Sequence, residues 1–257
     1  MVNSRPALVI SAAVLALVVG TTGVDATGIG SAAPASAAED RSDVPTLYPA
    51  VQVSNRELRR VDSIELGAES LVFRDDDHTV VDVSMRDSRT TVELLGRLLG
   101  KPSRTQTAVG DGGACLPAST TSTWAGAIRV AALRVPASAG NAVEVRVLKS
   151  SVRTRSGSRV ELSGPGGVQV GDDVEDDLRA APRADKESYG SGDARAWQLL
   201  LEPGWEPTDD DSVAEDRNDD DDQHDDDRGT NGVSALTNDT EVTVIGSPMP
   251  VHARRSC

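Results

Sequence analysis

Histidine, the side chain most often used as a general base near neutral pH, is scarce in this chain. The 257 residues include three histidines, His78, His224 and His252, and no G-x-S-x-G turn that would hold a nucleophilic serine. A Ser-His-Asp triad needs a histidine positioned beside a serine. His78 directly follows three aspartates, a composition typical of a turn. The sequence therefore predicts that the protein is not an enzyme, and it assigns no catalytic residue.

A glycine-rich stretch from Gly164 to Gly171 is similar to a phosphate-binding loop in composition only. Its glycine spacing fits neither the dinucleotide-binding nor the P-loop pattern. The acidic residues that follow, between Asp172 and Asp177, would repel phosphate. We interpret the stretch as a turn that precedes a helix.

The chemically distinctive segment runs from Asp209 to Arg228. It contains 12 acidic and two basic residues, a net formal charge of -10 within a chain whose total is -15. Carboxylate oxygens are good Ca²⁺ ligands, but the D-x-D-x-D-G order of an EF-hand loop is missing. Runs of like charge self-repel and stay solvated. We interpret the segment as a solvated loop that aids solubility, with calcium binding and docking to a basic partner as alternatives.

Calcium is the one cofactor that the sequence suggests, and only for this alternative. The aspartates that would bind it are Asp219, Asp220, Asp221, Asp222, Asp225, Asp226 and Asp227.

The two cysteines, Cys115 and Cys257, predict one disulfide bond. Paired thiols are typical of exported proteins, because the extracellular compartment is oxidising. The bond would close a loop of roughly 140 residues and contribute up to about 5 kcal/mol in the chain-entropy model. Two free thiols and an intermolecular pair are the alternatives.

An export signal is indicated at the N-terminus. A short basic start, Met1 to Arg5, precedes an apolar run of 13 residues, Ala7 to Val19. The stretch Ala35-Ser36-Ala37 fits an A-x-A cleavage pattern, so we expect cleavage near Ala37/Ala38. The mature protein is expected to be secreted or associated with the cell envelope. No later apolar run reaches the roughly 18 residues of a membrane span. The total charge of the chain is acidic, which argues against a nucleic acid partner because phosphate groups bind to basic surfaces.

The periodicity of the mature chain predicts an α+β fold in which short helices pack on one face of an antiparallel sheet. Strands are expected over Thr79–Met85, Trp124–Arg134 and Val143–Leu148, where apolar and polar residues alternate. A helix capped by Ser88 and ending at Gly100 should bury Val92, Leu95, Leu98 and Leu99.

The chain also contains two similar stretches that indicate an internal repeat. A second short helix, capped by Asp172 or Asp173, ends before Pro182 as the first ends before Pro102, and a tryptophan follows each, Trp124 and Trp197. A repeat of roughly 75–80 residues is the interpretation. The predicted organisation is a signal peptide over residues 1–38, a first α+β unit over 39–150 and a second over 151–257. The second unit carries an acidic insertion, expected to be disordered, over 206–231.

These pieces resemble a group of exported actinobacterial proteins of unassigned function. The matching stretches are Leu98 to Pro102, Gly113 to Cys115, Trp124 to Leu133 and Val168 to Pro182. More remotely, the pattern is similar to the secreted β-lactamase-inhibitor proteins and the small outer-membrane-assembly lipoproteins. The resemblance implies an α+β architecture and a binding role, and it carries over no catalytic residue. Arg86, where the first unit would have glycine, and the acidic insertion depart from the pattern.

The sequence thus predicts an exported, non-catalytic binding or interaction protein of the bacterial cell envelope or medium. Its partner would be a protein or a cell-wall component. A calcium-responsive envelope protein and an inhibitor of a secreted enzyme are the alternatives. For an inhibitor, Trp205 is the candidate contact residue, because tryptophan is frequent at interface hot spots.

A calorimetric Ca²⁺ titration of residues 39–257, with limited proteolysis at each end point, tests the acidic segment. We expect no saturable heat and unchanged cleavage there, because a solvated loop binds no ion specifically. Saturable heat together with protection of residues 209–227 would instead identify a calcium site.

Overall fold

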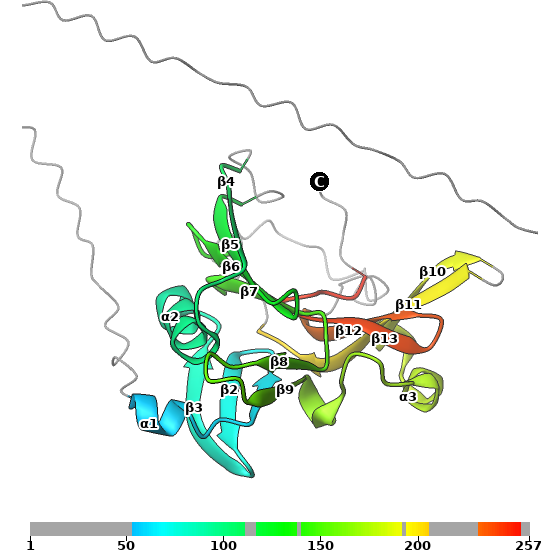
Figure 1. The fold of residues 1–257 in the computed structure, drawn as a ribbon. Helices are drawn as coiled ribbons and strands as arrows, with labels where there is room; N and C mark the ends of the chain where they lie inside the picture. The colour runs from blue at the N-terminus through cyan, green and yellow to red at the C-terminus, as the bar shows by residue number, and fades with distance from the viewer. Residues whose placement is uncertain (1–52, 111–116, 138–139, 192–193, 206–230, 253–257) are drawn as a thin grey trace, which may run out of the picture. The chain divides into compact units, whose positions relative to one another are not determined.

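The computed structural model describes residues 53–110, 117–137, 140–191, 194–205 and 231–252. These residues form two β-sheets and a few short helices, so the expected α+β class is confirmed (Figure 1). The helices are α1 (Asn55–Leu58), α2 (Ser88–Leu99) and α3 (Glu175–Ala180), and the 3₁₀ turns are η1 (Pro165–Gly167) and η2 (Arg183–Asp185).

The smaller sheet has five strands in the order β3-β2-β1-β9-β8. The strands are β1 (Ser63–Leu66), β2 (Ser70–Asp75), β3 (His78–Ser84), β8 (Ser151–Arg153) and β9 (Arg159–Ser163). β1 and β9 are parallel, and the other neighbours are antiparallel.

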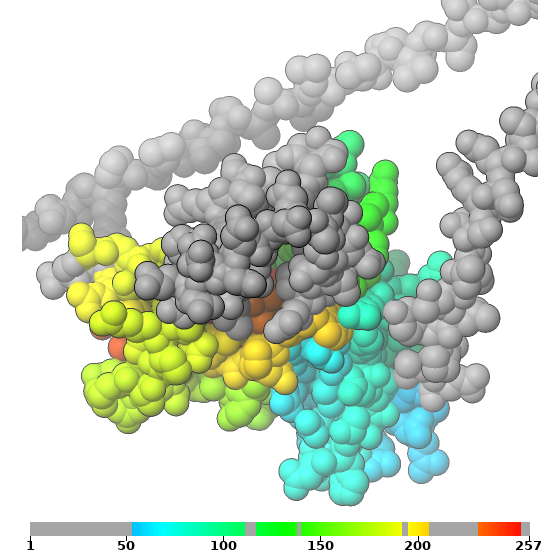
Figure 2. Space-filling view, turned by 180° about the vertical axis from the view of Figure 1, so that it is seen from behind, coloured from blue at the N-terminus to red at the C-terminus, as the bar shows by residue number. Residues whose placement is uncertain are grey.

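The larger sheet has eight strands in the order β10-β11-β12-β13-β7-β6-β5-β4, all antiparallel. The strands are β4 (Arg104–Ala108), β5 (Ser119–Trp124), β6 (Ile128–Leu133), β7 (Val143–Val147), β10 (Lys186–Ser191), β11 (Ala194–Pro203), β12 (Gly232–Asn238) and β13 (Glu241–Ser247). Seen from behind, β2 and β3 (cyan) and the β10–β11 region (yellow) contribute to the surface (Figure 2).

A helix followed by a four-stranded meander occurs twice. α2 precedes β4–β7, α3 precedes β10–β13, and the two meanders meet where β7 pairs with β13. Trp124 lies on β5 and Trp197 on β11, the second strand of each meander. Strands from both sides of residue 150 contribute to both sheets, so the two halves of the chain share their sheets.

The core is built mainly from aliphatic side chains that both sheets and α2 contribute. Among the described aromatic residues, Phe73 and Trp124 are almost fully buried, with exposed fractions of 0% and 2%. The indole Nε1 of Trp124 donates a hydrogen bond of 2.9 Å to the Gly100 carbonyl. This bond connects the end of α2 to the eight-stranded sheet.

The N-cap of α2 differs from the expectation. Ser88 is the first helical residue, and Asp87 is the cap, because its carboxylate accepts from the Thr90 backbone N–H (2.9 Å) and the Thr90 hydroxyl (2.6 Å). The buried face also differs from the expectation: Leu95 and Leu98 are buried as expected, whereas Val92 and Leu99 are only partly buried. Thr91 and Leu94 take the remaining buried positions.

The expectation of one strand over Trp124–Arg134 was wrong. Trp124 ends β5, and Ala125 and Gly126 form a tight turn into β6. The register pairs Trp124 with Ile128, so Ala127 is the third residue of this turn, and its N–H donates a hydrogen bond of 2.8 Å to the Trp124 carbonyl. Ala125 and Gly126 have positive φ values of 50° and 62°. A second difference concerns α3, whose N-cap is Val174, while the Asp173 carboxylate accepts from the Glu175 N–H at 3.0 Å.

Replacement of the α2 cap should measurably lower stability. We expect Asp87→Ala to reduce the free energy of unfolding by about 1 kcal/mol, because the Thr90 N–H loses its acceptor. Asp87→Asn is the matched control and should retain most of the stability, since asparagine caps helices about as well. Urea unfolding followed by circular dichroism measures both, and equal losses in the two variants would contradict the capping role.

Candidate functional site

Several residues singled out in the sequence lie outside the described residues. These are the predicted signal peptide, both cysteines of the predicted Cys115–Cys257 disulfide, and all seven candidate calcium ligands. The disulfide and the calcium site therefore stay predictions. Within the described ranges, no helix is long and apolar enough to cross a membrane.

Trp205, the predicted partner contact, is partly buried against the core. The Arg86 guanidinium lies over its indole ring, 4.5 Å from the ring centroid. Such a cation–π contact stabilises by about 0.5–1 kcal/mol at an exposed site. Arg86 therefore holds the ring from one side, and the role of Trp205 in binding a partner stays a prediction.

The structure directs attention to a basic segment that our sequence reasoning missed. Between Arg97 and Arg159 the chain contains ten basic and two acidic residues, a net formal charge of +8. The total charge of -15 conceals this segment because the aspartates elsewhere outweigh it. A charge count in a sliding window would have found it.

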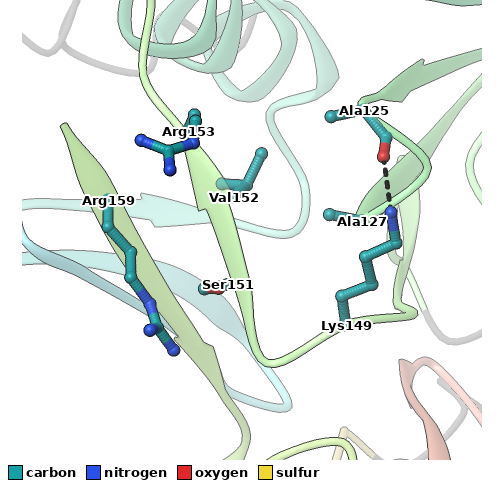
Figure 3. A pocket seen from close by; sticks show the side chains of 7 residues that line it. All are labelled: Ala125, Ala127, Lys149, Ser151, Val152, Arg153 and Arg159. Carbon is teal, nitrogen blue, oxygen red and sulfur yellow. Dashed lines mark hydrogen bonds between the residues drawn. The ribbon is translucent and has the colours of Figure 1, made fainter. Parts of the chain in front are cut away.

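Part of this segment lines an open hollow of about 370 Å³ (Figure 3). The lining residues are Ala125, Ala127, Lys149, Ser151, Val152, Arg153 and Arg159. Lys149 lies across the hollow from the two arginines, and its ammonium donates a hydrogen bond of 3.0 Å to the Ala125 carbonyl. This bond holds the chain that enters β8 against the β5–β6 turn.

The alternation of the β8–β9 hairpin determines which side chains face solvent. Val152 and Val160 are buried in the core, with exposed fractions of 5% and 0%. Successive side chains of a strand point to opposite faces. Arg153 and Arg159 therefore lie on the outer face, and both are exposed.

Arg153 and Arg159 are directly opposite each other in the antiparallel register. Like charges in this position destabilise a sheet unless an anion compensates them. Arg153 donates to the Gly157 carbonyl at 3.1 Å. Within the described part of the chain, no carboxylate lies within 4.0 Å of either guanidinium or of the Lys149 ammonium. Three cations thus surround one hollow without a counter-ion from the described residues.

A second hollow, of about 470 Å³, has Arg59, Arg97 and Arg155 among its lining residues. Arg97 is already engaged there: it donates to the Asn55 side-chain oxygen (3.0 and 2.9 Å) and to the Val53 carbonyl (2.7 Å). Its guanidinium secures the start of α1, and its Nη1 lies 3.8 Å from the Glu93 carboxylate. One of the three arginines of this second hollow therefore has a counter-ion among the described residues, whereas no cation of the first hollow does.

The chemistry available in the first hollow is that of anion binding. Ser151 supplies a hydroxyl, and none of the lining residues is a carboxylate, a histidine or a cysteine. No group of three or more metal-binding side chains occurs among the residues that the structure describes. Guanidinium and ammonium groups instead donate charge-assisted hydrogen bonds to carboxylates and phosphates.

Substitutions on the buried and the exposed face of β8 should differ in their effect on stability. We expect Val152→Ala to lower the free energy of unfolding by about 2 kcal/mol, because it removes buried methyl groups. Arg153→Gln should change it by less than about 0.5 kcal/mol, since the side chain is exposed and has no ion pair within the described residues. Chemical unfolding measures both, and a large loss in Arg153→Gln would assign that arginine a structural role.

Comparison with known proteins found no relative of this chain. No family model, no curated protein and no solved structure matches this chain. The resemblance to exported actinobacterial proteins therefore stays a prediction.

Proposed function

We propose that this protein is an exported, non-catalytic binding protein of the bacterial cell envelope or medium, and that its partner carries anionic groups. The observation that supports this proposal is the hollow formed by Lys149, Arg153 and Arg159, whose three cations have no carboxylate within ion-pair distance among the described residues. An anionic partner would supply the missing counter-charge.

The exposure of these cations determines what kind of binding they can support. Each exposed ion pair contributes only about 0–1 kcal/mol, and salt screens it. A single anion would therefore bind weakly, whereas a partner with several regularly placed anionic groups could engage all three cations. An anionic cell-wall polymer has this character, and it is available to a protein with the predicted export signal.

The distribution of charge also favours a defined orientation. The chain carries a net charge of -15, while its 97–159 segment carries +8. An anionic partner is repelled by the acidic parts of the chain and attracted by the basic segment. Such charge asymmetry orients the encounter before close contacts form.

Titration with poly-L-glutamate of defined length tests the proposal, with binding to the purified protein followed by calorimetry at several salt concentrations. We expect the double variant Arg153→Gln/Arg159→Gln to bind at least about tenfold more weakly and with a shallower salt dependence, because two charge-assisted contacts are lost. The two proteins are best compared at low ionic strength, because exposed charges are least screened there.

The matched control is Arg60→Gln/Arg179→Gln, which removes the same total charge. Arg60 pairs with Asp75, and Arg179 pairs with Glu175 at 2.8 Å, so both guanidiniums already have a carboxylate partner. We expect the control to bind like the wild type. Equal weakening in the two double variants would mean that only total charge matters, and the proposed site would be wrong.

A further inference from the structure

Arginines also form a row across the eight-stranded sheet. The antiparallel registers place Arg104, Thr123, Arg129, Arg146 and Gly246 opposite one another on β4, β5, β6, β7 and β13. Directly opposed residues share one face of a sheet. From Arg104 to Arg146 the row covers three strand spacings, about 14 Å.

This row lies on the face of the sheet that is turned away from the core. The flanking residues Ile128 and Val130 on β6, and Val145 and Val147 on β7, have exposed fractions of 0–1% and belong to the core. The period of two along each strand therefore directs Arg129 and Arg146 to the opposite side. Arg129 is exposed and Arg146 is half-buried.

Gly246 explains why Arg146 is half-buried on an outer face. A Cβ atom at position 246 would lie 2.7 Å from the Arg146 Cδ and 3.0 Å from its Nε. The arginine side chain thus lies flat over the bare backbone of β13. Only a residue without a side chain leaves that room.

Toward the described residues, the Arg146 guanidinium uses one of its hydrogen-bond donors. It carries five N–H donors, and within the described part of the molecule its Nη1 donates to the Val145 carbonyl at 3.0 Å. Burial lowers the pKa of Arg146, while nearby Glu144 raises it and Arg129 lowers it. Both the burial and the neighbouring arginine thus disfavour the charged form, as expected for a cation without a close counter-ion.

Arg129 and Arg146 face each other directly in the register. Their Cβ atoms are about 4.5–5.5 Å apart in this arrangement, a position in which like charges repel. Glu144, two residues along β7 on the same face, is not within 4.0 Å of either guanidinium. One carboxylate cannot neutralise two guanidinium groups, so Arg129 and Arg146 keep a net positive charge at this place on the sheet.

We propose that Arg129 and Arg146 form a binding site for a tetrahedral oxyanion, a phosphate or sulfate group. The Arg146 guanidinium lies over β13, and the exposed Arg129 side chain can extend from β6 across β7 toward it, so that N–H donors of both guanidiniums reach one anion. Charge-assisted pairs of guanidinium groups with such anions are bidentate and directional. The anion removes the repulsion between the arginines. Thr123, the next residue in the row, adds a hydroxyl beside Arg129.

This site is distinct from the hollow lined by Lys149, Arg153 and Arg159. It uses other residues: Arg129 and Arg146 lie on strands of the eight-stranded sheet, whereas Arg153 and Arg159 lie on strands of the five-stranded sheet. Variants at either site therefore leave the other intact, so the two proposals can fail separately.

Titration with inorganic phosphate, followed by NMR of the arginine Nε–H signals, tests the site in a buffer without other phosphate or sulfate. We expect saturable shifts of the Arg129 and Arg146 signals, half-complete below about 10 mM phosphate. Arg129→Gln and Arg146→Gln should each weaken binding at least about tenfold, because one of the two guanidinium forks is lost.

Gly246→Ala is the most specific variant, because it displaces the Arg146 side chain without changing the charge, and it should weaken binding similarly. Arg129→Gln removes an exposed side chain and tests the site if Gly246→Ala does not fold. Arg153→Gln/Arg159→Gln should bind phosphate like the wild type. Arg129 and Arg146 signals that do not saturate, or that shift no more than the distant Arg179 signal, would overturn the proposal.

Two further probes identify the source of the anion. Glycerol 3-phosphate that binds at least as tightly as inorganic phosphate would indicate a phosphate ester on a larger molecule. Binding of inorganic phosphate alone would indicate a site for the free anion. Acetate that binds as tightly as phosphate would contradict a tetrahedral oxyanion site.

Discussion

Two long-range strand pairs hold the fold together. β1 pairs in parallel with β9, and β13 pairs with β7, so each sheet is completed only when segments roughly 100 residues apart in the chain meet. The buried valines and leucines of both sheets then form one core, in which the aromatic contribution is small. Since aliphatic side chains bury less area than rings, this core depends on many small contacts and on the two pairings that align them.

The same strand registers impose the most unusual feature of the surface. Arg153 faces Arg159 in the small sheet, and Arg129 faces Arg146 in the large one. A like-charged cross-strand pair costs stability. On β8, an edge strand, exposed charge also discourages pairing with another chain. That explanation does not extend to β6 and β7, which are interior strands, so at Arg129 and Arg146 an anionic ligand is the better account.

Much of the local structure could be predicted from residues close together in the sequence. Val143, Val145 and Val147 alternate with Glu144 and Arg146, and this pattern was confirmed as a half-buried strand. β4 and β5 escaped prediction because their serines and threonines show no apolar alternation, although their backbones pair regularly. The candidate hollow could not be derived from the sequence, because its residues come from the β5–β6 turn and the β8–β9 hairpin.

The sequence alone therefore determined the α+β class, several strands and the local charge, because periodicity and composition act over a few residues. It also contained the basic segment from Arg97 to Arg159, although only a local charge count reveals it. The tertiary structure decided which charges meet. A cross-strand neighbour is set by register, and register depends on how distant strands bury their apolar faces together. The contact of Arg146 with Gly246, 100 residues later, exists only in the folded sheet.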